Sequence, residues 1–230
     1  MRVLVLSLDS SSIASVALSR DGEVLREFAT SDTRSHAEAL APAVRGLMSA
    51  QGVTGAELDA LLVGTGPGPF TGLRAGLATA RALGFAWDLP VHGLCSLDAV
   101  AHRVAPAVRS AGHPEFLVAI DARRKELYWR HYRVDDAAAD TSATPVSAPQ
   151  VGAPEELPDL PCAGPGAGLY PDRLAHPLLG TEELHPTAAD LARAGWALTS
   201  RGTPLSTDTS PLYLRDSDAK VPASLKRVTS

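Results

Sequence analysis

Two aspartates lie where apolar segments end, and both are followed by residues that can hold a metal ion or orient a phosphate. Asp9 ends the first apolar segment and is followed by Ser10 and Ser11. Asp121 ends a second apolar segment and precedes basic residues. These four residues form a candidate nucleotide-binding set. Asp and Ser also form turns after strands, and the sequence leaves both interpretations open.

A glycine-rich turn, Gly64–Arg74, stands between an expected strand and an expected helix, which is where a phosphate-binding loop is found. The Walker pattern ends in Gly-Lys-Ser/Thr, but this turn contains no lysine. It also fails the Gly-x-Gly-x-x-Gly dinucleotide pattern. Pro67 and Pro69 remove two backbone N–H donors that a phosphate cradle would use. The sequence therefore argues against phosphate binding in this turn.

The helix expected over 70–87 carries a small residue at every fourth position, so these residues share one face. The small residues are Gly72, Gly76, Ala80 and Gly84. A glycine inside a helix costs about 1 kcal/mol relative to alanine, so this glycine ridge needs a use, which is the close approach of another element. The pattern leaves open whether that element is the chain's own sheet or a second polypeptide. Arg74 and Arg81 lie on a different, polar face.

The sequence lacks the residue patterns by which hydrolytic enzymes usually bind a metal ion or activate a nucleophile. None of the seven histidines lies four residues from another, so no helix carries a His-x-x-x-His metal face. No Gly-x-Ser-x-Gly nucleophile elbow occurs. We interpret His36, beside Glu38, as part of a helix start rather than as a catalyst. The sequence therefore predicts no metal site, and it gives poor support to a metalloprotease or a serine hydrolase.

Hydrophobic periodicity and turn signals predict the elements that position these residues. Asp21-Gly22 indicates a hairpin turn between the second and third expected strands, and Ser35 with Glu38 indicates a capping box at a helix start. In the first half we expect strands over 2–9, 13–19 and 23–29, a helix over 35–51, a strand over 58–64, a helix over 70–87 and a strand over 90–94. A helix over 96–104 is expected to follow, with Ser96 as its cap.

The second half opens as the first does, with a strand over 116–121, a short polar turn and a strand over 126–134. This similarity suggests a duplicated lobe. The region 135–161 is expected to be irregular, with one short strand near Val146. A second glycine-rich turn follows at 164–168, and Thr187 is expected to cap a helix that runs through Leu198.

The composition is that of an ordinary globular protein. The chain has 230 residues, of which 45% are apolar and 20% charged, enough for one large domain or two small ones. The net charge of −5 does not favour independent nucleic-acid binding, since such binding usually needs a basic face. No apolar run approaches the roughly 20 residues of a membrane span, and the two cysteines form no disulfide framework. We therefore expect a cytoplasmic protein with no secretory signal and no membrane association.

Several segments together resemble one known family. They are Val3–Asp9 with its serine-rich turn, Ser35–Glu38, Gly64–Arg74, Ala119–Arg123 with Glu126–Trp129, Gly164–Gly168 and Pro211–Arg215. They occur in the order and spacing of the bacterial TsaB (YeaZ) family, and the resemblance covers essentially the whole chain. The Gly64–Arg74 and Ala119–Trp129 segments are together specific. Pro69 departs from the family, which usually carries serine there.

The resemblance implies an α/β protein with an actin-like, Hsp70-like (ASKHA) duplicated two-lobe fold and ribonuclease H-like lobes. We expect an N-terminal lobe over 1–105, which carries the partner-binding helices, and a C-terminal lobe over 106–230. The boundary is approximate, and the C-terminal tail is free to return to either lobe.

The resemblance also implies membership of the machinery that forms N6-threonylcarbamoyladenosine at position 37 of tRNAs reading A-starting codons. The expected role is that of a non-catalytic scaffold that binds the catalytic homologue TsaD and is joined by the ATPase TsaE. A homodimer is expected when the partner is absent, and tRNA is expected to be reached only through the complex. No cofactor is expected, except ATP or ADP at the partner interface. The alternatives are an ATP-binding or ATP-hydrolysing protein of the same fold, and a glycoprotease-like peptidase.

In that family the partner interface uses the two helices that match 35–51 and 70–87 here. The resemblance therefore turns the glycine ridge from an open question into an expected partner surface. The interface residues that it implies are Leu40, Val44, Leu47, Phe70, Gly72, Leu73, Gly76, Leu77, Ala80 and Gly84.

Overall fold

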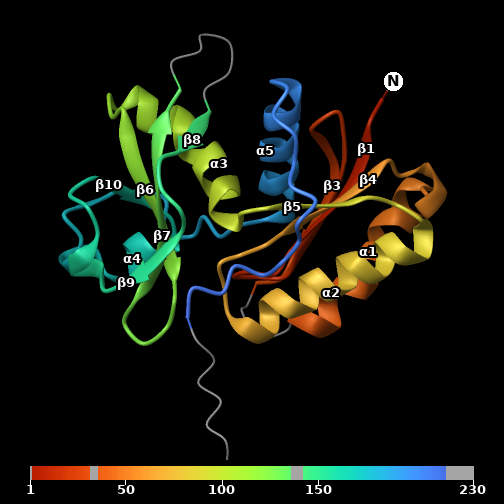
Figure 1. Cartoon of the computed structure of the whole chain (residues 1–230), viewed down its shortest axis with the longest axis horizontal. Helices are drawn as coiled ribbons and strands as arrows, with labels where there is room; N and C mark the ends of the chain where they lie inside the picture. Colours follow the sequence, from red (N-terminus) through yellow and green to blue (C-terminus); the bar gives the residue numbers. More distant parts are fainter. Residues whose placement is uncertain (1, 32–35, 136–141, 216–230) are drawn as a thin grey trace, which may run out of the picture.

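Two mixed α/β sheets form two lobes that lie side by side, with helices between them (Figure 1). The computed structural model describes residues 2–31, 36–135 and 142–215. The first sheet has the strand order β3-β2-β1-β4-β5. Its strands are β1 (Leu4–Asp9), β2 (Ser15–Arg20), β3 (Glu23–Ala29), β4 (Ala60–Gly64) and β5 (Val91–Leu94).

The second sheet repeats this topology. Its order is β11-β10-β6-β7-β8, and β9 also pairs with β7. The strands are β6 (Glu115–Asp121), β7 (Leu127–Val134), β8 (Ala143–Pro145), β9 (Gln150–Gly152), β10 (Pro161–Ala163) and β11 (His176–Pro177). In both sheets the first two strands pair antiparallel. Strand β4 pairs parallel with β1 and β5, and β10 likewise pairs parallel with β6 and β11. The predicted duplication is confirmed.

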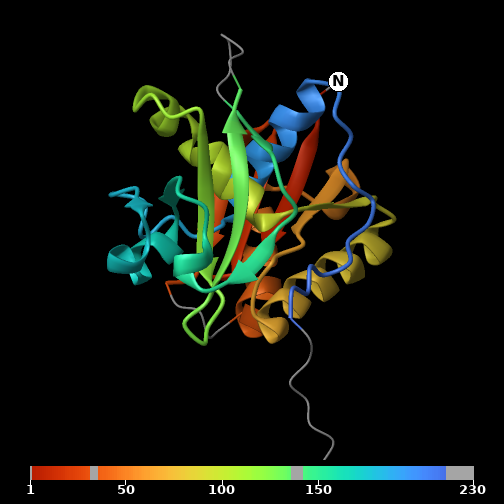
Figure 2. The same ribbon diagram turned by 60° about the vertical axis from the view of Figure 1, so that its left-hand side comes forward.

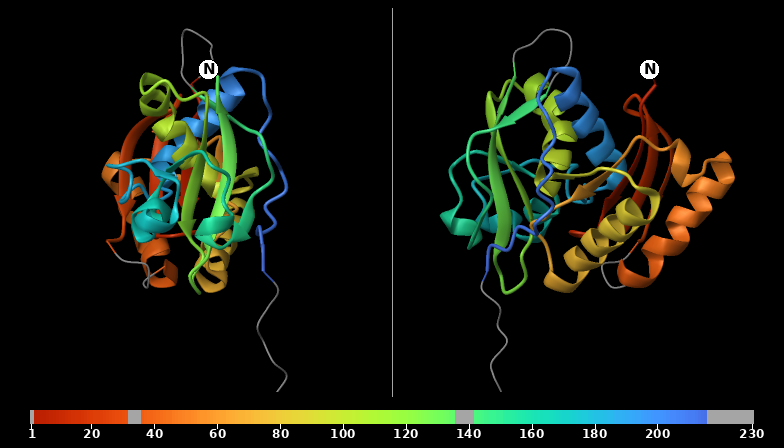
Figure 3. Two further views of the ribbon diagram at one scale, coloured as in Figure 1. Left: turned by 90° about the vertical axis from the view of Figure 1, so that its left-hand side faces the viewer. Right: turned by 45° about the vertical axis from the view of Figure 1, so that its right-hand side comes forward.

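Within the described residues, five α-helices cover the sheets in layers (Figures 1 and 3). Helices α1 (His36–Gln51) and α2 (Phe70–Trp87) cover one side of the first sheet, and α5 (Ala188–Ser200) covers the side that is turned toward the second sheet. Helix α3 (Ser96–Ser110) packs on the second sheet and on α5, so these two helices fill the space between the sheets. The short α4 (Pro165–Leu169) covers the far face of the second sheet. Three 3₁₀ turns span Gly55–Glu57, Pro154–Glu156 and Pro171–Arg173.

Successive side chains of a strand point to opposite faces of the sheet, and this alternation explains the layers. Leu4, Leu6 and Leu8 point from β1 toward α1 and α2, whereas Val5 points toward α5. In the second sheet Phe116, Val118 and Ile120 join the core beside α3, and Leu117 and Ala119 join the core beside α4. Each sheet is therefore buried on both faces, as strands with nearly continuous apolar runs predict.

Three expectations from the sequence need correction. The helix expected over 96–104 continues through Pro106 to Ser110, and its N-cap is Cys95 rather than Ser96. The Gly164–Gly168 turn is largely the short helix α4. The region after Asp135 holds two short strands near Val146, β8 and β9, instead of the single strand expected there. The capping box at Ser35 and the polar end of the tail lie outside the described residues.

The helices between the sheets each pack on the lobe formed by the other half of the chain. Helix α3 follows the first sheet in the chain but packs on the second, and α5 follows the second sheet but packs on the first. This exchange joins the two lobes through the α3–α5 contact (Figure 2). The boundary near residue 105 stays a prediction. In the described parts of the chain, no helix is both long enough and apolar enough to cross a membrane.

The glycine ridge of α2 packs on the chain's own first sheet. The Ser10 hydroxyl donates to the Gly72 carbonyl at 2.7 Å and accepts from the Gly76 N–H at 3.1 Å. A Cβ at Gly76 would collide with the Ser10 hydroxyl, and one at Gly84 would collide with Val91. The missing side chains thus let α2 approach the end of β1 closely enough for these hydrogen bonds, which offsets the helix-propensity cost of glycine.

The ridge can be tested with two matched glycine substitutions. Gly76→Ala should lower the free energy of unfolding by about 1–3 kcal/mol, because its Cβ displaces the buried Ser10 hydroxyl from its partners. Gly46→Ala in α1 should instead raise it by about 0.5–1 kcal/mol, because a Cβ there meets open space and alanine favours a helix. Urea denaturation measures both variants. Equal effects of the two substitutions would contradict this packing.

Candidate functional site

A buried carboxylate organises the end of the first sheet. Asp9 is fully buried, and its Oδ1 accepts hydrogen bonds from the Ser11 N–H at 2.8 Å and the Ser11 hydroxyl at 2.6 Å. Its Oδ2 accepts from the Ser96 hydroxyl at 2.6 Å, and a Cβ at Gly64 would collide with that oxygen. Both oxygens are thus occupied by the chain itself, so Asp9 acts as a structural acceptor in this conformation.

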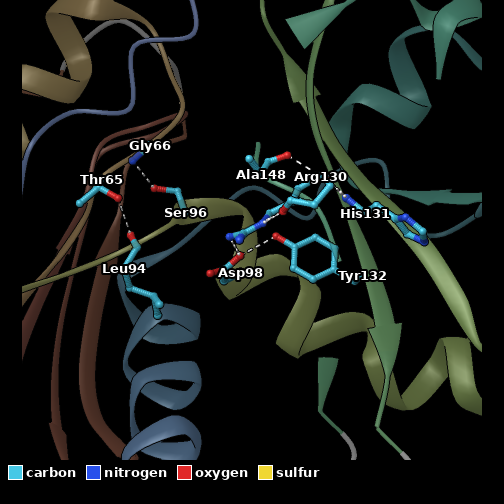
Figure 4. Close-up of polar contacts among 10 residues, drawn as sticks. Thr65, Gly66, Leu94, Ser96, Asp98, Arg130, His131, Tyr132 and Ala148 are labelled. Carbon is cyan, nitrogen blue, oxygen red and sulfur yellow. Dashed lines mark hydrogen bonds and ion pairs between the residues drawn. The ribbon is translucent and has the colours of Figure 1, made fainter. Parts of the chain in front are cut away.

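Burial raises the pKa of the Asp9 carboxyl above its ordinary value, and the hydrogen bonds from Ser11 and Ser96 oppose that shift. The Ser96 hydroxyl therefore serves Asp9 instead of capping α3, which explains why the sequence prediction of a Ser96 cap was wrong. Ser96 also accepts the Gly66 N–H at 3.1 Å (Figure 4). The glycine-rich turn, β1 and α3 meet at this group of residues.

A cavity of about 300 Å³ lies between the lobes beside this group. Asp121 lines it and is paired with Arg123, whose backbone N–H lies 2.7 Å and whose guanidinium lies 3.1 Å from the carboxylate. On the other side the Ser12 hydroxyl and the His185 Nδ1 are 2.7 Å apart, and burial lowers the pKa of His185. The lining residues also include Ser11, Pro69, Pro165, Gly168, Leu169, Glu182 and Glu183.

A second polar group connects the lobes at the start of α3. Asp98 accepts hydrogen bonds from Arg130 at 2.8 Å and from the Tyr132 hydroxyl at 2.6 Å, and both side chains project from β7 toward α3 (Figure 4). Burial raises the pKa of Asp98, while Arg130 and Tyr132 oppose the shift. Cys95 is buried beside this pair, and burial raises its thiol pKa far above the usual range. These contacts fix α3 on the second sheet and leave Cys95 as an unreactive thiol.

The C-terminal segment 206–215 runs between the lobes and holds both of them (Figure 1). The Arg81 Nε donates to the Thr209 hydroxyl at 2.9 Å, and the Leu212 N–H donates to the Thr65 carbonyl at 2.9 Å. At the far end Arg215 donates to the Ala122 carbonyl at 2.9 Å. The polar face of α2, which the spacing of its two arginines predicted, therefore contacts this segment.

The surface of α1 and α2 that faces away from the sheet is largely apolar. We call it the outer face. Phe85 stands on it with 92% of its surface exposed. Most of its other exposed residues are small, which makes it flat, and α1 also exposes Glu38, Arg45 and Gln51. The small residues include Ala41, Pro42, Gly46, Ser49 and Ala50 of α1, and Thr71, Ala78, Ala82 and Ala86 of α2.

Comparisons with known proteins agree on one family. A family model described as TsaD, tRNA N6-adenosine threonylcarbamoyltransferase, matches residues 23–177. A solved structure of YeaZ from Pseudomonas aeruginosa is 32% identical, covers 92% of this chain and 100% of its own, and superposes with a TM-score of 0.74. The chain belongs to the TsaD/YeaZ family. The predicted actin-like two-lobe fold is confirmed with it.

Other relatives of this TsaD/YeaZ-family chain differ in how much of it they match. An uncharacterized protein of Mycobacterium tuberculosis is 39% identical over 94% of this chain and 93% of its own length. The tRNA threonylcarbamoyladenosine biosynthesis protein TsaB of Escherichia coli is 36% identical, but that match spans 57% of this chain and 56% of the relative. The similarity to proteins with that name is thus concentrated in part of the chain.

The structure places most of the expected interface residues of this family member inside its own core. Phe70 is exposed at the start of α2, but the others are buried under the helices: Leu40, Val44, Leu47, Gly72, Leu73, Gly76, Leu77, Ala80 and Gly84. They point at the sheet because they form the apolar stripe by which α1 and α2 fold onto it. The surface that these helices offer to a partner is the outer face instead. Partner binding itself stays a prediction.

The four residues of the candidate nucleotide-binding set are also separated. Asp9, Ser10 and Ser11 are buried and hydrogen-bonded within the chain, whereas Asp121 lies across the interlobe cavity, which Ser11 also lines. The sequence interpretation missed Ser12, Arg123 and His185 at that cavity, and it missed the outer face. The helical spacing of Ala78, Ala82 and Phe85 was a signal for the outer face. Among the described residues, no three His, Cys, Asp or Glu side chains gather as a metal site.

The buried Asp9 carboxyl should make the stability of the folded chain depend on pH. Because the folded state raises the pKa of Asp9 above the ordinary 3.8, protonation favours folding. The stability of the wild-type chain relative to Asp9→Asn should be greatest below that ordinary pKa and should fall as the pH rises through the folded pKa.

Urea denaturation of both proteins at several values between about pH 4 and pH 7 measures this difference. Subtracting the two free energies of unfolding cancels the contributions of Asp98 and of every other titrating group that the two proteins share. A difference that stays flat or rises with pH would contradict the raised pKa of the buried Asp9 carboxyl.

Proposed function

We propose that this chain is the non-catalytic scaffold subunit of the complex that forms N6-threonylcarbamoyladenosine at position 37 of tRNAs reading A-starting codons. In this proposal it binds the catalytic TsaD homologue through the outer face. Membership of the TsaD/YeaZ family supports the process. The exposure of Phe85 at the C-terminal end of α2, beside a flat row of alanines, is the observation that supports the docking role.

The outer face suits helices of a partner for a physical reason. Small residues at helical spacing let a second pair of helices approach closely, and burial of their apolar surface then drives association. Phe85 supplies a large aromatic anchor, the type of side chain that dominates binding energy at interfaces. In the absence of the partner the same face suits a second copy of this chain, which would give a homodimer.

The remaining members of the proposed complex follow from the same family assignment. A TsaE-like ATPase joins the pair, and tRNA binds to the assembled complex. ATP or ADP, where present, lies at the interface with the partner. The cytoplasmic location expected from the sequence is part of this proposal. The alternative of an independent ATP-binding protein is not favoured by the geometry, because both Asp9 oxygens already accept hydrogen bonds within the chain.

Phe85→Ser should weaken the heterodimer with the cognate TsaD homologue by at least about tenfold in Kd, because it removes the exposed aromatic anchor. Leu179→Ser is the matched control, since Leu179 is 85% exposed but lies in the second lobe, and it should bind as the wild-type chain does. Calorimetric titration of each variant with the partner measures the Kd. A wild-type Kd for Phe85→Ser would refute docking through the outer face.

A further inference from the structure

A second cavity, of about 620 Å³, opens where the start of α2, the β6–β7 hairpin and the C-terminal segment meet. Three arginines and three aromatic residues line it, and none of its lining residues is acidic. They are Arg74, Arg123 and Arg215 with Phe70, Tyr128 and Tyr213, beside Gly68, Pro69, Ala122 and Leu214. We call it the aromatic–arginine cavity. In a chain of net charge −5, this composition is suited to an anionic ligand with a flat ring.

Two of the aromatic rings form a preorganised platform. Phe70 and Tyr213 stack with their centroids 5.0 Å apart and their planes inclined by 25°. The Arg74 guanidinium carbon lies 3.4 Å from the Phe70 ring centroid, and its Nε donates to the Tyr213 hydroxyl at 2.7 Å. Phe70 and Tyr213 nevertheless remain 44% and 41% exposed. The rings are held in place and still offer accessible surface to a ligand.

The three arginines that line the cavity differ in whether a carboxylate neutralises their charge. Arg123 is paired with Asp121, and Arg215 is paired with Glu126. Arg74 forms an ion pair with no carboxylate among the residues that the structure describes. It is therefore the guanidinium best placed to neutralise an incoming phosphate beside the platform.

The β6–β7 hairpin extends the basic surface away from the cavity. Arg123, Arg124 and Lys125 are all exposed and have φ values of 63°, 56° and 64°. Three successive non-glycine residues in the left-handed region are strained, and such strain gathers at functional sites. Arg123 lines the cavity, and Arg124 and Lys125 follow it on the exposed hairpin, which gives a longer run of charge than one nucleotide requires.

We propose that the aromatic–arginine cavity binds single-stranded RNA, with a base stacked on Phe70 and Tyr213 and a neighbouring phosphate at Arg74. Single-stranded nucleic acid is held in general by a positive groove combined with aromatic faces on which bases stack. The run of cations on the hairpin favours RNA over a free nucleotide, because phosphates on either side of the stacked base would then be neutralised as well. Only the choice of RNA rests on the proposed function. The cavity adjoins the interlobe cavity that Asp121 and His185 line, and the two share Pro69 and Arg123.

The test uses the full chain and a fluorescein-labelled oligoadenylate of about eight nucleotides, titrated by fluorescence anisotropy at about 50 mM salt. Phe70→Ala should weaken binding about fivefold or more through lost stacking. Arg74→Gln should weaken it and also reduce the slope of log K against log salt by about 0.7, the value for one lost phosphate contact on a single strand.

Two controls match these variants in chemistry. Phe28→Ala removes an aromatic residue of similar exposure from β3, and Arg133→Gln removes a cation from the opposite end of β7. Both should bind the oligoadenylate as the wild-type chain does, with an unchanged salt slope. Thermal melting of every variant shows whether it is folded, and Tyr213→Ala provides a second test of the platform that leaves α2 intact.

Three results would overturn the inference: no binding of the oligoadenylate by the folded wild-type chain, wild-type binding by Phe70→Ala and Tyr213→Ala, or an unchanged salt slope for Arg74→Gln. Displacement of the RNA by ATP at an equal concentration of nucleotides would assign the cavity to a free nucleotide instead. A chain that forms the TsaD heterodimer but fails to bind RNA would refute this inference alone. A chain that binds RNA but not the partner would refute the scaffold role alone.

Discussion

The Asp9 carboxylate is the point at which the first lobe is joined to the rest of the chain. It terminates β1, accepts both donors of Ser11 in the following turn, and accepts the hydroxyl of Ser96 at the start of α3. Ser96 in turn holds the glycine-rich turn through Gly66. A buried carboxylate is tolerated only when its lone pairs are occupied, so these partners and the glycine at position 64 are required together. This constraint makes the end of the sheet a structural junction, in which both Asp9 oxygens accept hydrogen bonds from the chain itself.

The same junction determines which surfaces α2 has left for other molecules. Ser10 fixes the glycine ridge against the sheet, so the ridge is used inside the chain. The arginines at 74 and 81 contact the C-terminal segment at the edge of the helix. What remains is the outer face with Phe85 and the stacked rings at the helix start. We propose that the outer face binds the catalytic partner and that the stacked rings contact RNA.

The sequence predicted the elements well because hydrophobic periodicity and turn residues are local signals. The bounds of β3 and α2 agree with the structure, and Thr187 caps α5 as its type and position indicated. The errors arose where a distant contact decided the outcome. Ser96 failed as a cap because its hydroxyl serves Asp9, 87 residues away in sequence. The glycine ridge is the clearest case, since small residues allow close approach but the sequence does not say to which element. Likewise, no local pattern indicated that Tyr213 would stack on Phe70 from the other end of the chain.

The proposed docking surface is the outer face and not the ridge, and thiol accessibility tests this proposal directly. Cys95 and Cys162 are buried, and burial raises the pKa of Cys162 to about 12, so neither should react with a maleimide in the folded chain. An Ala82→Cys variant therefore carries one accessible thiol, in the middle of the outer face. Its rate of modification, measured with and without the cognate TsaD homologue, should fall at least about tenfold when the heterodimer forms. An unchanged rate in a heterodimer that is shown to be intact would contradict docking through this face.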